Sequence, residues 1–436
     1  MKRTGPLAIV LVLLGSHASA LTMEEAVGTA LANHPRIRQF DQASHAQAER
    51  VESRRSPFWP ELSLGYSYVW ESGQIRIFPD TDQVSIFSAK ATYNLFRGFS
   101  DRQLLDSEAA RYTAARYQQR GVEQDVALEV RRAFLELLRA RDRVAVEKES
   151  VDLLERQRRE AEIFYREGVF AKNDLLRVEV ELATARQTLL TAESGLRTAR
   201  RGLERAMGAP VREGEEPADP GPFDPVRQEE ANLRDEMMGA RSELLFLKAL
   251  REARIRSRKA IRGGYYPEAD LTLAYRAFGD DLAPTGTDDS FPDRETNVTF
   301  ELTWTLFDGF RKKHDLLAEE REIRVLEEQF RDTGEELSLQ LTRAVEAFDL
   351  AAARKGVAEK SVEQAQENYR ITENQFRERV ATTTDLLDAR VFLTRARNEA
   401  SNAFYDLLQA RVALDRIVER PLPAARATGE APPPPR

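Results

Sequence analysis

The hexapeptide NLFRGF at residues 94–99 decides the organisation of this chain, because a close copy, TLFDGF, stands at residues 305–310. Each copy follows a stretch in which apolar and polar residues alternate, and each precedes a long run without proline. Alternation with period two predicts a β-strand, whereas a long run with helical periodicity predicts a helix. The hexapeptides therefore mark two strand-to-helix junctions, whose central residues are Phe96, Gly98 and Phe99, and Phe307, Gly309 and Phe310.

The two junctions belong to an internal duplication. Leu95 matches Leu306 at an offset of 306 − 95 = 211, and DLL at 174–176 meets DLL at 385–387 at the same offset. Upstream, Pro60 meets Pro267 at an offset of 267 − 60 = 207. Such a constant register predicts two copies of one structural unit. We place the repeats at 21–208 and 226–418, separated by a Pro/Gly/acidic linker at 209–225 and followed by a disordered proline-rich tail at 419–436.

The N-terminus and the overall composition indicate an exported protein. Residues 1–20 combine a basic start, a short apolar core and a small-residue ending at Ala20, which predicts a secretory signal peptide. The net charge of −8 argues against a nucleic-acid partner. The chain has no cysteine, which excludes a disulfide framework, a thiolate site and an N-terminal lipid anchor. The few histidines have no metal-ligand spacing, and we expect neither an enzyme nor a cofactor.

Each repeat has the same expected plan. A helical stretch, at about 22–56 and 226–262, precedes two alternating segments, which we predict as strands over 62–70 and 89–95 in the first repeat and 271–275 and 298–306 in the second. The longer of these suit tilted membrane-spanning strands, which need about 9–11 residues. Proline-free runs at 99–165 and 310–376 then predict helices on the order of 100 Å long.

A short turn and a returning helix complete each repeat. The turns read REGVFAKND and RERVATTTD. Large and small residues then alternate in a strict heptad, which predicts close antiparallel coiled-coil packing. The seam of the first repeat is Leu175, Val178, Leu182, Ala185, Leu189, Ala192, Leu196, Ala199, Leu203 and Ala206, and that of the second is Leu386, Ala389, Leu393, Ala396, Ala400, Ala403, Leu407, Ala410, Leu414 and Ile417.

Four strands per chain cannot close a transmembrane barrel, because such barrels begin at about eight strands. An open sheet edge is not tolerated in lipid, so several chains must pool their strands if these strands cross a membrane. Aromatic residues stand where an interfacial belt is expected, at Phe58, Trp59, Tyr265, Tyr266 and the junction phenylalanines. A soluble rod with two β-hairpins is the alternative, and it leaves the aromatic clusters and the export signal unexplained.

The duplicated halves, the two junction hexapeptides and the two DLL helix starts resemble the TolC-like outer membrane factors over residues 22–418. The resemblance implies a mainly α-helical chain with a membrane β-barrel portion, in a homotrimer with a twelve-stranded barrel in the outer membrane lipid and a helical tunnel in the periplasm. It implies a passive export duct of a tripartite efflux pump or a type I secretion system. Its partners would be a periplasmic adaptor and an inner-membrane transporter.

The segment ATTTDLLDAR at 381–390 carries the main candidate site. We expect Thr384 to cap the returning helix and Asp385 to interact with its dipole, with Asp388 on the same face. For one chain alone, helix capping explains these residues. The resemblance instead places Asp385 and Asp388 in a carboxylate ring at the closed periplasmic mouth, supported by Asp174, although Arg177 stands where the first repeat would have its second acid.

The turn residues Gly168, Val169, Arg379 and Val380 are the expected docking points for the adaptor. Arg379 departs from the pattern because the first turn has a glycine at that place. Two other classes of protein remain open, a periplasmic adaptor and a soluble periplasmic coiled-coil protein. An adaptor carries one helical hairpin and a membrane anchor, whereas this chain has two hairpin patterns and neither kind of anchor, a transmembrane helix or a lipid-bearing cysteine.

Overall fold

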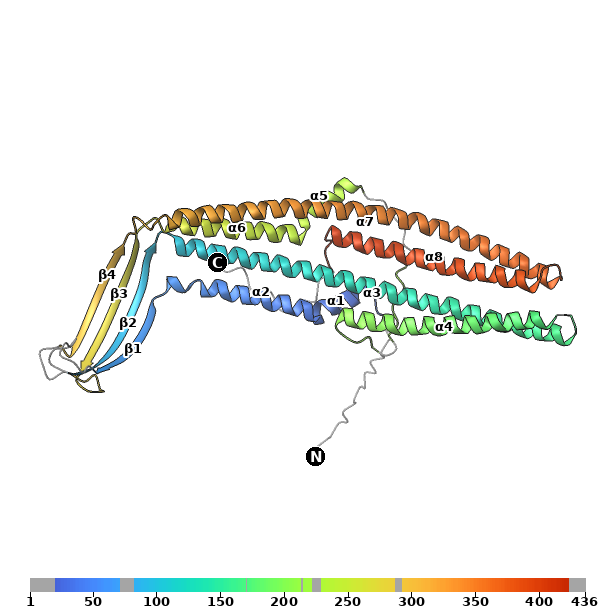
Figure 1. Cartoon of the computed structure of the whole chain (residues 1–436), viewed down its shortest axis with the longest axis horizontal. Coiled ribbons are helices and arrows are strands. Elements are labelled where there is room, and N and C mark those ends of the chain that lie inside the picture. The colour runs from blue at the N-terminus through green and yellow to red at the C-terminus, as the bar shows by residue number, and fades with distance from the viewer. Residues whose placement is uncertain are drawn as a thin grey trace, which may run out of the picture. The chain divides into compact units, whose positions relative to one another are not determined.

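A computed structural model describes residues 20–70, 82–169, 171–212, 215–221, 229–286 and 292–422. The elements in chain order are α1 (Met23–Asn33), α2 (Pro35–Ser53), the 3-10 helix η1 (Ser56–Phe58), β1 (Glu61–Trp70), β2 (Gln83–Arg97), α3 (Ser100–Arg166), α4 (Lys172–Met207), α5 (Glu230–Ala240), α6 (Ser242–Gly263), β3 (Glu268–Gly279), β4 (Arg294–Thr303), α7 (Arg311–Arg377) and α8 (Thr383–Ile417) (Figure 1). The predicted signal peptide up to residue 19, parts of the linker and the tail from residue 423 lie outside the described residues.

The order of elements confirms the duplication. Two helices, two strands, a long helix and a returning helix occur twice, and α3 and α7 each have 67 residues. Both predicted helical stretches before the strands are divided in two. In the first repeat the break falls at His34, which has extended backbone because the residue before a proline is disfavoured in a helix.

The compact units of the structure do not coincide with the repeats. One unit comprises Met1–Ile37, Glu123–Met237 and Gln340–Arg436, and the other comprises Arg38–Val122 and Met238–Leu339. Each unit therefore contains residues from both repeats.

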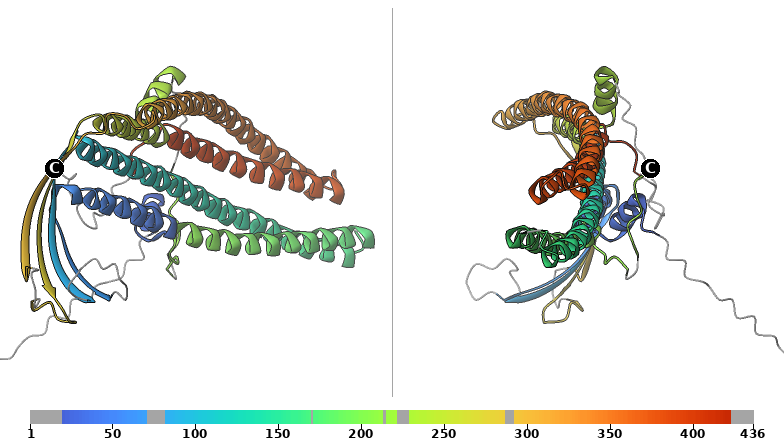
Figure 2. Two further views of the ribbon diagram at one scale, coloured as in Figure 1. Left: turned by 60° about the vertical axis from the view of Figure 1, so that its left-hand side comes forward. Right: turned by 90° about the vertical axis from the view of Figure 1, so that its right-hand side faces the viewer.

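The second of these units, which we call the sheet unit, contains one antiparallel sheet with the strand order β1-β2-β3-β4 (Figure 2). The central β2–β3 pair joins the two repeats, with a register shift between Asn94 and Phe96. The sheet unit also contains α6 and parts of α2 and α3, which pack against one another. Ser107 Oγ of α3 donates to the carbonyl oxygen of Ala253 in α6 at 2.9 Å, and Gln47 of α2 donates to Glu108 of α3 at 2.8 Å.

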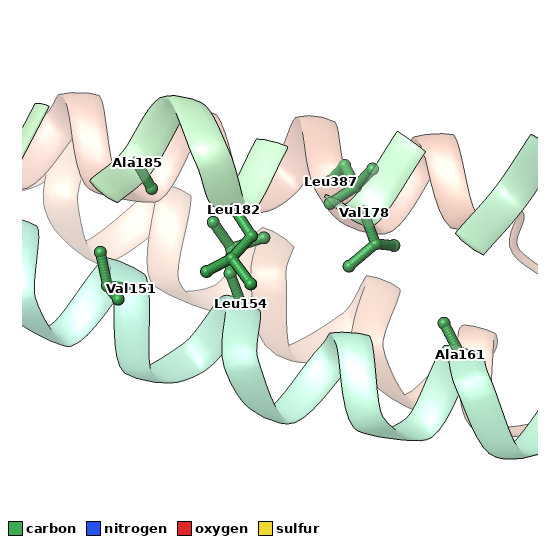
Figure 3. Packing of buried hydrophobic residues seen from close by; sticks show 7 residues of the cluster. All are labelled: Val151, Leu154, Ala161, Val178, Leu182, Ala185 and Leu387. Carbon is green, nitrogen blue, oxygen red and sulfur yellow. The ribbon is translucent and has the colours of Figure 1, made fainter. Parts of the chain in front are cut away.

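The other unit, which we call the hairpin unit, contains the returning helices. The apolar side chains of α3 and α4 interlock along the heptad seam, and Leu387 of α8 closes the same cluster (Figure 3). On the other side of α3, the buried Tyr405 of α8 donates a hydrogen bond to Asp142 at 2.6 Å. All seam residues of α4 and α8 are buried or half-buried, which confirms the predicted coiled-coil packing.

Segments assigned to the linker and the tail contribute ordered contacts to the hairpin unit. The Leu21 N–H donates to the Glu216 carbonyl oxygen at 2.9 Å, and the Ala218 N–H donates to the Leu21 carbonyl oxygen at 2.8 Å. Arg141 of α3 donates to the neighbouring Pro217 carbonyl oxygen at 3.2 Å. Near the end of the chain Glu419 is almost fully buried.

Two further observations concern the membrane and the strand ends. Within the described ranges, no helix combines the length and the apolarity that a membrane crossing requires. The predicted strand over 298–306 starts earlier and ends earlier, because β4 covers Arg294–Thr303. Trp304 and Leu306 lie beyond its end, because the ladder with β3 stops at the pair Glu268 and Thr303. The indole N–H of Trp304 donates to the Tyr265 carbonyl oxygen at 3.1 Å.

Candidate functional site

The two junction hexapeptides adopt the same local structure. Gly98 and Phe99 both have positive φ angles, 59° and 63°, and Gly309 and Phe310 have 69° and 66°. The ring of Phe99 packs edge-on against that of Phe96 with centroids 5.3 Å apart, and the second phenylalanine pair repeats this at 5.4 Å. Two consecutive left-handed residues turn the chain sharply from strand to helix. The left-handed conformation is unfavourable for a phenylalanine, and in each pair the ring of the left-handed phenylalanine packs against the ring of the other.

The surroundings of the two junctions differ. A Cβ on Gly98 would lie 2.0 Å from the carbonyl oxygen of Gly263 and 3.0 Å from the Cβ of Tyr266. Gly98 is accordingly buried. A Cβ on Gly309, by contrast, would meet no heavy atom within 4 Å apart from those of its chain neighbours in the described residues, and Gly309 is exposed. One sequence motif therefore occurs once covered and once open. Gly263, which provides the cover, was missed by the sequence reasoning.

The two turns at the far ends of α3 and α7 are also equivalent. The Val169 N–H donates to the Phe164 carbonyl oxygen at 2.9 Å, and the Val380 N–H donates to the Gln375 carbonyl oxygen at 2.8 Å. Both turns are Schellman motifs, which need a left-handed residue at the position after the helix cap. Gly168 adopts φ 75° there. Arg379 adopts φ 63° at the equivalent place, so the departure from glycine leaves the fold of the turn unchanged.

Arg379→Gly is expected to stabilise the chain by about 1 kcal/mol, because a left-handed non-glycine residue carries a cost of that order. Thermal unfolding in detergent, followed by circular dichroism at 222 nm, measures the change. Arg379→Ala is the matched control, since it removes the exposed side chain and keeps the strained backbone. If the alanine variant gains as much stability as the glycine variant, the side chain and not the backbone is the source of the cost.

The start of α8 corrects one sequence assignment. Thr382, not Thr384, is the N-cap, and its side chain accepts from the Asp385 N–H at 3.2 Å. The Asp385 carboxylate in turn accepts from the Thr382 N–H at 2.8 Å and from its hydroxyl at 2.7 Å, which completes a capping box. These hydrogen bonds, first that from the hydroxyl, lower the pKa of Asp385 below its usual value. The spacing of a threonine three residues before an acid was the available signal.

The start of α4 lacks this cap. Ala171 holds the N-cap position and has no side-chain oxygen, while Asp174 occupies the place that corresponds to Asp385. Arg177 of α4 donates to the Thr384 hydroxyl at 2.5 Å, and this bond joins the starts of α4 and α8. The hydroxyl expected to cap the helix therefore connects the two repeats instead.

The structure brings the three candidate acids onto two adjacent helix starts. Asp385 and Asp388 are exposed at the start of α8, and Asp174 is half-buried at the start of α4. Farther along α8, Arg390 is almost fully buried and donates to Ser150 of α3 at 2.8 Å, a contact that the sequence pattern did not predict. Burial lowers the pKa of Arg390, although Glu181 partly offsets this. Among the described side chains, no cluster of three or more His, Asp or Glu residues is arranged to hold a metal ion.

Comparison with known proteins identifies the family. A model of the outer membrane efflux protein family matches residues 26–209 and 233–418. Protein CyaE of Bordetella pertussis is 22% identical over 311 residues, which cover 70% of this chain but only 64% of CyaE, less than two thirds of its length.

Solved structures agree with this assignment. A structure of CusC, described in terms of folding and transmembrane channel formation, superposes with a TM-score of 0.78 at 13% identity over 91% of both chains. The outer membrane protein VceC from Vibrio cholerae superposes with a TM-score of 0.76 at 16% identity, over 91% of this chain and 95% of its own. The resemblance to TolC-like outer membrane factors is confirmed, and the chain belongs to the outer membrane efflux protein family.

Proposed function

We propose that three copies of this chain form an export duct, with a twelve-stranded barrel in the outer membrane and a helical tunnel in the periplasm. The observation that carries the proposal is the two-faced sheet of the sheet unit. Cross-strand pairing aligns Leu62, Ala91, Leu273 and Val298 in one apolar row across all four strands. A second row joins Tyr93, Leu271 and Phe300 on the same face. The side chains at the two edges of the first row are the most exposed, with Leu62 78% exposed and Val298 70% exposed.

The opposite face of the sheet is polar. Ser63, Lys90, Ala274 and Asn297 form one row, and Glu61, Thr92, Thr272 and Thr299 form the next. An exposed apolar face on one side and a polar face on the other is typical of a barrel wall between lipid and an aqueous lumen. In water the apolar face would be an extensive unburied patch, which folded soluble proteins avoid.

The sheet has two edges that need partners. Within the described chain β1 pairs only with β2, and β4 only with β3. Because unpaired backbone groups are very costly in lipid, the edges of several copies must close on one another. Three copies are the number implied by the resemblance to TolC-like factors, and 3 × 4 strands give twelve.

The hairpin unit then supplies the periplasmic entrance. Asp385, Asp388 and Asp174 stand at helix starts next to the two Schellman turns. A threefold arrangement would bring six exposed carboxylates of α8 together, and such a ring favours cations at a constriction. The exposed Val169 and Val380 at the turn tips offer apolar contacts to the helical hairpin of a periplasmic adaptor, which in turn meets an inner-membrane transporter.

Fractionation and conductance test this function. We expect the protein in the outer membrane fraction, as an oligomer that runs as such on a gel without heating and as a monomer after heating. Reconstituted into planar bilayers, it should conduct ions with a preference for cations. A monomer in the soluble periplasmic fraction would contradict the channel and favour a soluble coiled-coil protein.

A further inference from the structure

The ion pairs between α6 and α7 follow one face of α6. The two helices lie side by side in the sheet unit (Figure 1 and Figure 2). Arg251 of α6 donates to Glu327 of α7 at 2.8 Å, and Arg254, three residues on, donates to Glu319 at 3.2 Å. Both basic side chains in this part of α6 therefore have an acidic partner on α7.

Closer to the sheet, the same face of α6 continues without acidic partners. Arg258 and Arg262 follow at intervals of four residues, which keeps them on that face. The start of α7 lies beside them, since a Cβ on Gly264 would be 3.7 Å from the side chain of Lys312. The first turn of α7 contains Arg311–Lys313 and no acidic residue. Neighbouring like charges repel one another, and the positive end of the helix dipole disfavours cations.

The acids nearest to this turn do not neutralise it. Asp308 accepts from the Lys312 N–H at 3.1 Å and lies 3.9 Å from its Nζ. The half-buried Lys312 also donates to the Thr305 carbonyl oxygen at 3.2 Å, and its Nζ lies 5.3 Å from the ring centroid of Tyr265. Asp315 makes no ion pair within 4 Å in the described chain. We call the four basic side chains that lack an acidic partner among the described residues the basic patch: Arg258, Arg262, Arg311 and Lys313.

The duplication provides a neutral counterpart of this region. The offsets of 207 and 211 carry six basic residues of the second repeat, Arg258, Lys259, Arg262 and Arg311–Lys313, onto Val51, Glu52, Arg55 and Ser100–Arg102. The first set has six positive charges, whereas the second has two of each sign and a net charge of zero. Arg55 pairs with Glu52 at 3.4 Å, and Arg102 pairs with Asp106 at 3.3 Å. The junction fold therefore does not require the positive charge, which belongs to the second repeat alone.

The basic patch borders the aromatic end of the apolar face. Trp304 is 57% exposed, Phe307 is 72% exposed and Phe310 is 59% exposed. Arg311 follows Phe310 directly, and the Nζ of Lys313 lies 5.9 Å from the Phe310 ring centroid. Because a helix rises 1.5 Å per residue, the basic residues of this turn lie within about 5 Å of the aromatic residues along the axis of α7. Positive charge beside exposed apolar surface is complementary to a molecule with an anionic head and an apolar tail.

We propose that the basic patch binds the phosphate headgroup of an anionic phospholipid in the periplasmic leaflet of the outer membrane. Its acyl chains lie against Trp304 and Phe307. The guanidinium groups of Arg262 and Arg311 offer paired N–H donors to phosphate oxygens, and Lys313 adds a point charge. This inference rests on the proposed barrel, which places the junction at the membrane surface, and it adds the class of lipid that the second junction selects.

Fluorescence quenching beside the patch tests the proposal. The chain has three tryptophans, so Trp59→Phe with Trp70→Phe leaves Trp304 as the only indole. The oligomer is reconstituted into phosphatidylcholine vesicles that contain an equal fraction of either brominated phosphatidylglycerol or brominated phosphatidylcholine. At low salt, the anionic lipid should quench Trp304 more strongly than the zwitterionic one. High salt should weaken this preference, because it screens exposed charges.

Two double variants in this background locate the charges responsible. Arg262→Gln with Lys313→Gln should reduce the preference for the anionic lipid several-fold, because each basic side chain near an anionic surface strengthens the attraction by a factor of about five. Arg55→Gln with Arg102→Gln is the matched control, since it removes the same charge at the equivalent positions of the first repeat. The control should keep the preference.

Four results would contradict the lipid site. Equal quenching by the two lipids, in an oligomer that is inserted into the vesicles, would overturn the site and leave the channel intact. An equal loss of preference in the two double variants would replace it by a general effect of net charge. Loss of the preference on addition of inorganic phosphate at constant ionic strength would make the patch a site for free phosphate. A protein that does not insert as an oligomer would overturn both the site and the channel.

Discussion

Gly98→Ala is expected to destabilise the chain by on the order of 3 kcal/mol, adding the cost of a left-handed alanine to that of overpacking. The new Cβ would lie 2.0 Å from the Gly263 carbonyl oxygen. Neither residue can retreat easily, because both belong to the backbone where β2 passes into α3 and α6 passes toward β3. We therefore expect the loss of the junction between sheet and helices, with a lower yield of folded oligomer.

The matched control for this variant is Gly168→Ala. Gly168 has a similarly positive φ of 75°, but nothing lies within 4 Å of its added Cβ in the described chain. Gly168→Ala should be destabilised by only about 1 kcal/mol, which is the conformational cost of a left-handed alanine. Thermal unfolding in detergent measures both variants. Equal destabilisation of the two would mean that the close approach to Gly263 contributes nothing.

The second large effect concerns ion selectivity. Asp385→Asn combined with Asp388→Asn should reduce the preference for cations several-fold, because it removes six carboxylates from the proposed mouth of the proposed trimer. The reversal potential across a planar bilayer under a KCl gradient measures the preference. Low ionic strength is the sensitive condition, since salt screens exposed charges within about 10 Å at 0.1 M. An unchanged reversal potential would remove these residues from the constriction.

Asp385 has a second role that the experiment must separate. Its carboxylate is part of the capping box with Thr382, so its removal also weakens the start of α8. Thr382→Ala provides the control, because it removes the cap, at about 1 kcal/mol of stability, and keeps both charges. Asp388→Asn alone removes a charge and leaves the cap. Ion selectivity should therefore change when Asp388→Asn removes a charge, and stability should fall when Thr382→Ala removes the cap.

The capping box also makes the stability of the folded chain depend on pH. The folded-state pKa of Asp385 lies below the ordinary value of 3.8 because Thr382 donates to the carboxylate. The stability from this interaction is therefore present above the ordinary pKa and is lost as the pH falls through the lowered one. Thr382→Ala should raise the pKa of Asp385 toward the ordinary value.

Much of this protein is determined by local sequence. Period-two and heptad patterns predicted four strands and two coiled-coil hairpins, and the proline-free run at 99–165 differs from α3 by one residue at each end. Two copies of a hexapeptide, with glycine beside phenylalanine, predicted the strand-to-helix junctions. These features depend on residues a few positions apart, which is the range over which side-chain periodicity and backbone preference act.

Tertiary structure decided what identical local sequences do in different surroundings. Gly98 and Gly309 share a motif and a conformation, yet one is packed against Gly263 and the other is open. β2 and β4 share a pattern, yet β4 stops at Thr303 because no described strand runs beside its continuation. Three consecutive threonines precede Asp385, and only the folded geometry gives Thr384 its hydrogen bond with Arg177 of α4. In each case the outcome depends on a segment distant in the chain, because strand pairing and close packing require a partner that no local pattern names.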